Sequence, residues 1–236
     1  GKALGKNRVS FEEPAERPDE GTDPGLHILR RPFFSMPGGR ITGYEYLGRS
    51  WPSGAGSGGR APAGVPGALL TVQRCLGAAA QMPAGLECHI RLHCSDLDGM
   101  DAAALLRLLP QGLDPALVCL ELRDLGRAPA SGPVHALLRS LLDGGLHPVL
   151  HDGDLMQLGM RALIRLEPAW VKLGRGCFSG VATDPFKEAS LRKVLKIVEG
   201  LGARVIACGV EDREDLDVLR QLKVSHGQGP LWSRHT

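Results

Sequence analysis

The chain has 236 residues, with 28 Lys and Arg against 26 Asp and Glu, and a formal net charge of +2. This balance, with only 4% aromatic residues, argues against a nucleic-acid surface of basic patches and stacking rings. No apolar run reaches the roughly 20 residues of a membrane-spanning helix, and no cleavable signal pattern opens the sequence. We therefore expect neither nucleic acid nor membrane contact from this segment.

The six cysteines include no CxxC pair, and several lie in apolar, strand-like runs. This usage predicts reduced and mostly buried thiols, and it argues against a zinc knuckle.

Two tracts of the sequence predict irregular structure. Residues 12–26 are acidic and rich in Pro and Gly, which predicts a linker. Residues 51–67, WPSGAGSGGRAPAGVPG, predict a low-complexity, mobile loop. Residues 27–236 are then the main folded domain.

From residue 28 onward, short apolar runs alternate with amphipathic stretches. Strands are expected at residues 28–34, 41–47, 88–94, 117–122, 147–152, 170–174, 204–210 and, more weakly, 224–228. Helical patterns with Pro, Asp or Gly at their ends occupy residues 133–145, 184–202 and 212–222.

Strands that alternate with helices predict parallel pairing through crossover helices. Eight strands in this length favour an α/β fold of the (β/α)₈ TIM-like barrel type, with an open doubly wound sheet as the alternative. No GxGxxG motif follows the first strand, so a dinucleotide-binding fold has little support.

Polar residues recur where the predicted strands end. In a barrel of parallel strands these ends meet on one face, where the chemistry of such folds takes place. Carboxylates, histidines and a lysine in successive units indicate a present or former metal site. The residues are Glu45, His93, Glu121, His151, Asp152, Lys172, Cys208, Glu211 and Gln228.

The motifs at these ends resemble those of EAL domains, the bacterial cyclic-di-GMP phosphodiesterases. GYEYLGR is similar to the family's GxExLxR, VIACGVED to VIAEGVE, and GQGPLWS to its QG-type ending. HCS, LELRD, LHDGD and VKLG stand, in order, where the family has NxS, ELTE, DDFG and KxD. The resemblance covers residues 27 to about 233, and it implies a barrel of EAL type with an antiparallel first strand.

The resemblance assigns a metal site to the barrel. Active members use Mg²⁺ or Mn²⁺, for which oxygen ligands are suited. Glu45 and Glu121 match first-metal ligands, Asp152 matches the second Asp of the DD pair, and Lys172 matches the lysine linked to the attacking water.

Four family positions have changed. The resemblance matches the family Asn to His93, the first Asp of DD to His151, the Asp of KxD to Gly174, and a catalytic Glu to Cys208. Loss of a positioned base typically costs ~10²–10⁴ in rate, and a thiol is a poor ligand for hard cations. We therefore expect a degenerate domain without catalytic activity and without a cofactor.

Much of the nucleotide-binding set is retained. By resemblance, Arg49 would face a ligand phosphate, Leu47 a base, and Gln228 and Glu211 a guanine edge. The implied function is a cyclic-di-GMP receptor. Pro230 replaces the aromatic residue after QG, which weakens that pocket.

The N-terminus adds context. Residues 1–11, GKALGKNRVSF, resemble the C-terminal tail of a GGDEF domain, the cyclase module that often precedes EAL. The expected setting is a bacterial, cytoplasmic signalling protein with an adjacent GGDEF domain and a homodimer as a further partner.

Other readings stay open. The domain could bind no nucleotide and act through protein contacts or dimerisation. It could retain phosphodiesterase activity, or use a Zn²⁺-like ion held by Glu45, His93, Glu121 and His151. Lys172 could neutralise the old metal site by pairing with Asp152 or Glu121, and Cys208 could be an inert buried thiol.

Overall fold

The computed structural model describes residues 26–50, 67–97, 99–127 and 132–233. The predicted GGDEF-like tail at residues 1–11, the predicted linker up to residue 25 and the predicted loop at residues 51–66 lie outside these ranges. The last linker residue, Leu26, already begins the first strand.

The described chain alternates strands and helices. The strands are β1 (Leu26–Ser35), β2 (Ile41–Ser50), β3 (Glu87–His93), β4 (Val118–Arg123), β5 (His147–His151), β6 (Trp170–Leu173), β7 (Arg204–Cys208) and β8 (His226–Gln228). The helices are α1 (Gly67–Ala79), α2 (Ala102–Leu106), α3 (Pro133–Asp143), α4 (Asp152–Gln157), α5 (Met160–Leu166), α6 (Arg175–Phe178), α7 (Pro185–Gly200), α8 (Arg213–Gln221) and α9 (Pro230–Ser233), with 3₁₀ turns η1 (Cys94–Leu97), η2 (Pro115–Leu117) and η3 (Leu125–Arg127).

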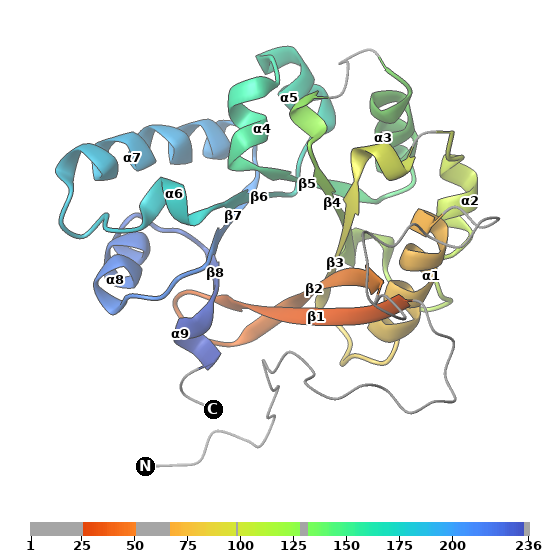
Figure 1. Cartoon of the computed structure of the whole chain (residues 1–236), viewed down its shortest axis with the longest axis horizontal. Helices are drawn as coiled ribbons and strands as arrows, with labels where there is room; N and C mark the ends of the chain where they lie inside the picture. The colour runs from red at the N-terminus through yellow and green to blue at the C-terminus, as the bar shows by residue number, and fades with distance from the viewer. Residues whose placement is uncertain (1–25, 51–66, 98, 128–131, 234–236) are drawn as a thin grey trace, which may run out of the picture.

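The eight strands close into a barrel in sequence order, β1 to β8 (Figure 1). Strands β2 to β8 pair in parallel, and β1 pairs antiparallel with both of its neighbours, β2 and β8. The predicted barrel and its antiparallel first strand are therefore confirmed, and the open-sheet alternative is wrong.

The three predicted helices, which correspond to α3, α7 and α8, begin and end within two residues of the predicted positions. Pro133 opens α3, and Gly144 follows its last residue. The side chain of Asp184 accepts hydrogen bonds from the backbone N–H groups of Phe186 and Lys187, which caps the N-terminus of α7. Residues 153–160, GDLMQLGM, contain most of α4 and the first residue of α5.

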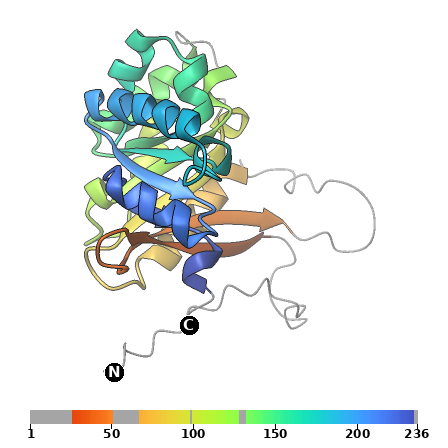
Figure 2. The same ribbon diagram turned by 90° about the vertical axis from the view of Figure 1, so that its left-hand side faces the viewer.

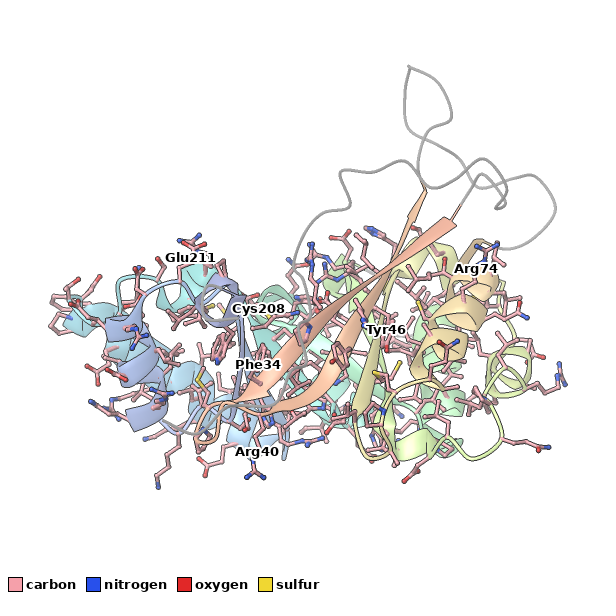
Figure 3. All side chains as sticks on the ribbon, turned by 90° about the horizontal axis from the view of Figure 1, so that it is seen from below. Phe34, Arg40, Tyr46, Arg74, Cys208 and Glu211 are labelled. Carbon is pink, nitrogen blue, oxygen red and sulfur yellow. The ribbon has the colours of Figure 1, made fainter. Side chains whose placement is uncertain are left out.

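Helices pack around the outside of the barrel, and α7 and α8 lie beside β7 and β8 (Figures 1 and 2). The main core fills the space between the barrel and these helices, with buried residues such as Leu76, Leu138, Phe178, Leu191 and Leu219. The long β1–β2 ribbon runs along one side of the molecule and carries Phe34 and Tyr46 (Figure 3).

A second, smaller apolar cluster fills the barrel interior. It consists of Phe33, Cys119, Val149, Trp170 and Ile206, all at most 1% exposed. The C-terminal ends of the parallel strands form what we call the upper end of the barrel, and the N-terminal ends form the lower end.

Among the described residues, no helix is both long and apolar enough to cross a membrane. The six cysteines all lie in the described part of the chain and form no disulfide, and Cys75, Cys88, Cys94 and Cys119 are buried, as the sequence predicts.

Candidate functional site

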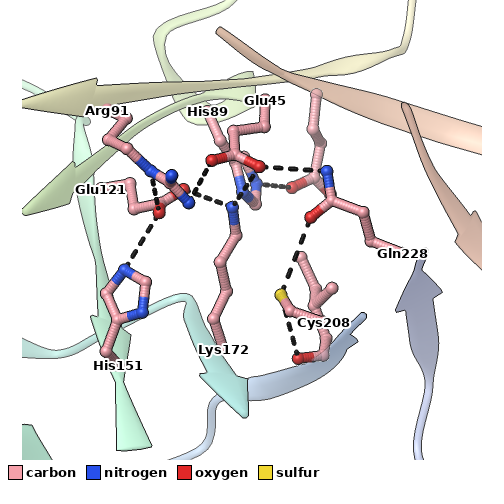
Figure 4. A network of polar contacts seen from close by, with 10 residues as sticks. Glu45, His89, Arg91, Glu121, His151, Lys172, Cys208 and Gln228 are labelled. Carbon is pink, nitrogen blue, oxygen red and sulfur yellow. Dashed lines mark hydrogen bonds and ion pairs between the residues drawn. The ribbon is translucent and has the colours of Figure 1, made fainter. Parts of the chain in front are cut away.

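A network of charged and polar side chains closes the upper end of the barrel (Figure 4). Each strand from β2 to β6 contributes one member, and β8 contributes another. We call this network the upper cluster; it consists of Glu45, Arg91, Glu121, His151, Lys172 and Gln228.

Glu121 on β4 is fully buried and has three partners. Arg91 on β3 donates from Nε to Oε1 at 2.7 Å. His151 on β5 places Nε2 3.0 Å from the same oxygen. Lys172 on β6 donates from Nζ to Oε2. Both carboxylate oxygens are thus occupied by side chains from β3, β5 and β6.

Glu45 on β2 is held by the same two cations. Lys172 Nζ lies 3.5 Å from Oε2, which also accepts a hydrogen bond from Gln228 Nε2 at 3.0 Å. Oε1 receives no aligned hydrogen bond, and its contact is an ion pair with Arg91 Nη2. Two carboxylates therefore share two fixed cations.

The charges of this network are mutually stabilised. Burial alone would lower the pKa of Lys172, but the carboxylates of Glu121 and Glu45 outweigh it and raise the pKa above its ordinary value. Burial would likewise raise the pKa of Glu121, but Lys172, His151 and Arg91 hold it well below its usual range. Glu121 and Lys172 are therefore both ionised in the folded state, because each faces an opposite charge.

Cys208 at the end of β7 does not act as a base in this environment. Its Sγ lies 3.7 Å from Gln228 Oε1 and 3.9 Å from the backbone oxygen of Ile206. Burial raises the pKa of the thiol to about 12, against the opposing effect of Lys172. The side chain is therefore a neutral thiol at physiological pH.

Asp152 and Gly174 lie together beside the upper cluster. A Cβ atom built on Gly174 would meet Asp152 Oδ2 at 3.6 Å, an ordinary contact. Cys177 at the start of the next helix donates from Sγ to the same oxygen at 3.0 Å. A carboxylate at position 174 would thus have faced Asp152, but the glycine offers no ligand atom.

Three further predicted residues, besides Asp152, Gly174 and Cys208, lie outside the upper cluster. His93 is 62% exposed, with Nδ1 3.9 Å from Asp124 Oδ2. Glu211 is bound by Arg175 Nη1 at 2.6 Å, and Figure 3 shows it at the outer edge of the molecule, beyond Cys208. Leu47 is partly buried on β2. The side chain of Arg49 lies outside what the structure describes.

The placement of His93 in the cluster is therefore wrong, and Arg91 takes that place. Arg91 pairs in register with Glu121 and Leu47, and its side chain is 26% exposed. The signal in the sequence that could have identified Arg91 is the two-residue alternation of side chains along a strand. Glu87, His89 and Arg91 alternate onto one face, whereas His93 is the last residue of β3.

A shallow cavity of about 320 Å³ opens above the cluster. Its lining includes Arg91, Arg123, His151, Asp152 and Lys172. The lining also includes Asp124 and Asp154, so three basic groups lie among three carboxylates, and the arginines offer planar donors that suit a phosphate.

Comparison with known proteins places this geometry in a family. The EAL domain family model matches residues 68–235. The chain belongs to the EAL domain family. No curated protein matches the chain.

Solved structures of EAL proteins share the fold. The EAL enzyme Bd1971, in a form with cAMP and cyclic-di-GMP bound, superposes with a TM-score of 0.73 at 19% identity, over 89% of this chain and 61% of that protein. The chain thus spans about three fifths of that relative. BlrP1 of Klebsiella pneumoniae, as a calcium and cyclic-di-GMP complex, gives 0.68 at 22% identity, over 88% of this chain and 54% of that one.

The PaMucR phosphodiesterase in complex with cyclic-di-GMP gives a TM-score of 0.71 at 19% identity, over 89% of this chain and 96% of that chain. A structure of BlrP1 with manganese and cyclic-di-GMP is also similar, with a TM-score of 0.68 at 21% identity, over 89% of this chain and 55% of that one.

The described residues of this EAL domain do not fit a pair of Mg²⁺ or Mn²⁺ ions. The oxygens of Glu45 and Glu121 are already in contact with Arg91 and Lys172. Position 174 lacks an oxygen donor, and Cys208 is a protonated thiol. A divalent cation would have to enter beside two fixed positive charges, which repel it.

Proposed function

We propose that this EAL domain is a noncatalytic receptor for cyclic-di-GMP in a bacterial signalling protein. The observation that carries the proposal is the contact of Arg91 and Lys172 with both Glu45 and Glu121. These cations take the charge-balancing role that metal ions have in active members. Phosphodiester hydrolysis by two metal ions requires the ions to hold both the attacking oxygen and the leaving oxygen. Without the ions, no turnover is expected.

The presence of Arg91 and Lys172 in place of metal ions also supports nucleotide binding without a metal. The phosphates of a cyclic dinucleotide need positive charge, and arginine suits them because its donors form a planar fork. Arg91 and Arg123 line the cavity above the upper cluster. By family resemblance, Arg49 would add a third arginine from β2. The neighbouring structures with cyclic-di-GMP bound support this choice of ligand.

We assign Gln228 a role other than the one that the resemblance implies. Its amide donates to Glu45 and faces Cys208, so it holds the upper cluster in place. Guanine recognition by Gln228 would require this amide to leave Glu45. We assign the base contacts to Leu47 on β2 and to Glu211, which would have to release Arg175.

Calorimetry with cyclic-di-GMP tests the proposal. In EDTA we expect saturable binding that added Ca²⁺ does not strengthen, and we expect Arg49→Ala to weaken it at least about tenfold, the scale of one charge-assisted hydrogen bond. Arg192→Ala is the matched control, because Arg192 is an exposed arginine of α7 paired with Glu188. Absence of saturable heat up to high micromolar nucleotide would contradict the receptor function.

A second function, as a nucleotide-free interaction domain, is favoured by one surface feature. Met156, Met160 and Ile164 on α4 and α5 are 82%, 57% and 60% exposed. Exposed apolar side chains that follow one another along the chain indicate a protein contact, here a second copy or the adjacent GGDEF domain. If calorimetry shows no binding, analytical ultracentrifugation of the chain and of Met160→Glu tests this function, with a monomer for both as the contrary result.

A further inference from the structure

An ion pair lies beside the rim of the cavity at the upper end of the barrel. Arg175 is the first residue of α6 and directly follows Gly174, which lines the cavity. Glu211 stands three residues after Cys208, which also lines it. Arg175 Nη1 lies 2.6 Å from Glu211 Oε1. The pair therefore joins the segment that follows β6 to the segment that follows β7.

The aliphatic stem of Arg175 lies against the backbone of Gly209. The φ angle of Gly209 is +83°, in the left-handed region that favours glycine. A Cβ atom at this position would lie only 2.7 Å from Arg175 Cγ and 2.9 Å from Cδ. The absence of a side chain at residue 209 thus gives the stem its place, and the guanidinium beyond it contacts Glu211.

The loop after β7 is anchored independently of this ion pair. The backbone N–H groups of Gly209 and Val210 both donate to the carbonyl oxygen of Gln228, at 2.6 and 3.1 Å. The side chains of Arg175 and Glu211 are 51% and 35% exposed, and exposed ion pairs contribute little to stability. The pair can therefore open while the loop keeps its position on β8.

The ion pair determines what Glu211 can bind. A carboxylate only accepts hydrogen bonds, so it suits the N–H groups on the edge of a guanine, including the exocyclic amine. In this structure the carboxylate of Glu211 is held by Arg175. A guanine must therefore replace the guanidinium, and the apparent affinity is reduced by the fraction of chains in which Glu211 is held.

Given the receptor function and the base contact assigned to Glu211 above, we propose that Arg175 sets the guanine specificity of the site by withholding Glu211 from the ligand. Cyclic-di-GMP binds by exchanging the ion pair for a contact between the carboxylate of Glu211 and a guanine. Arg175 is a positioning residue, because it acts on the ligand through Glu211. Removal of its charge therefore tightens the binding of a guanine ligand.

Calorimetry of the full chain with cyclic-di-GMP and with cyclic-di-AMP tests this assignment. Adenine lacks the exocyclic amine that guanine presents beside its ring N–H, so a free Glu211 favours only the guanine ligand. Arg175→Met keeps an unbranched stem against Gly209 and removes the charge. We expect this variant to bind cyclic-di-GMP about two- to fivefold more tightly, the equivalent of an exposed ion pair, with the affinity for cyclic-di-AMP unchanged.

Matched variants separate the ion pair from other effects. Arg175→Lys keeps a cation for Glu211 and should bind both nucleotides as the wild type does. Glu211→Ala should weaken the binding of cyclic-di-GMP, and Arg175→Met should give no gain in that background. Arg192→Ala removes an exposed arginine elsewhere, so it should change neither affinity and exclude an effect of net charge. Circular dichroism verifies that each variant is folded.

The outcomes distinguish this assignment from the receptor function. If the wild type binds cyclic-di-GMP and Arg175→Met binds it no more tightly, the assignment is overturned and the receptor function stands. An equal gain for both nucleotides, or a gain that persists without Glu211, overturns it in the same way. If neither the wild type nor Arg175→Met binds cyclic-di-GMP, the receptor function is contradicted and the role of Arg175 falls with it.

Discussion

Arg91 donates a hydrogen bond from Nε to Glu121 Oε1 at 2.7 Å, between adjacent parallel strands of the barrel. The same guanidinium forms an ion pair with Glu45 from the strand on its other side. A strand position that faces the carboxylates of a metal site thus carries a permanent cation. In a site that binds metal ions, the carboxylates are free to act as ligands. Here their charge is neutralised by the side chains of the protein itself.

The buried pair of Lys172 and Glu121 is expected to be strongly coupled. Lys172→Met should lower the free energy of unfolding by about 3–5 kcal/mol, because it removes the main compensation of a buried carboxylate. Glu121→Gln should cost a similar amount, and the double variant should cost less than the sum of the two. Urea unfolding of the four proteins measures this.

The control for that cycle is the exposed pair of Arg192 and Glu188 on α7. Its removal should cost about 0.5 kcal/mol or less, as is usual for surface pairs on a helix. Additive losses for Lys172 and Glu121 would show that the two side chains do not stabilise each other.

The acid sensitivity of the fold is expected to involve His226. Burial, with Arg204 nearby, lowers the pKa of its ring to about 4, below the ordinary value of about 6.5. The unfolded chain therefore binds this proton more readily, and stability falls as pH drops from about 6.5 toward 4. Above about pH 6.5 the ring is neutral in both states and has no effect.

Urea unfolding of the wild type and of His226→Gln at several pH values between about 7 and 5 tests this, since glutamine cannot be protonated. The slope of stability against pH should be shallower in the variant. Equal slopes would mean that other groups cause the dependence. The window stays above the range in which Glu121, whose pKa is depressed, takes up its proton.

Much of this arrangement could be predicted from the sequence. Apolar runs with turn residues between them indicated all eight strands, and the ends of those strands indicated Glu45, Glu121, His151, Lys172 and Gln228. The pairing of Lys172 with Glu121 was among the expected readings, because a buried lysine needs an opposite charge.

The rest depended on register, which local sequence does not fix. His93 fits a family motif with a serine two residues later, and this similarity concealed the alternation that turns Arg91 inward. Glu211 follows the strand end directly, yet Arg175 holds it at the rim.

Restoring the family residues is expected to restore metal binding. Arg91→Asn removes the cation between the two glutamates, and Gly174→Asp adds a carboxylate beside Asp152, at a position where a Cβ atom makes only ordinary contacts. Combined with Cys208→Glu, these changes should give Mn²⁺ binding at least about tenfold tighter than in the wild type, equivalent to about 1.4 kcal/mol. Arg91→Asn alone should give a smaller gain.

Electron paramagnetic resonance of free Mn²⁺ measures this gain. Glu121→Gln, added to the triple variant, should abolish it because a first-metal ligand is removed. A triple variant that is folded and binds Mn²⁺ no better than the wild type would show that Arg91 is not what excludes the metal.

The most direct measurement is the same Mn²⁺ titration of the wild-type chain, in the presence of cyclic-di-GMP, with the products analysed for linear dinucleotide. We expect no stoichiometric Mn²⁺ up to about 1 mM, a Kd equivalent to about −4 kcal/mol, and no hydrolysis. Two Mn²⁺ ions bound per chain, with accumulation of linear pGpG over many turnovers, would contradict a metal site neutralised by Arg91 and Lys172.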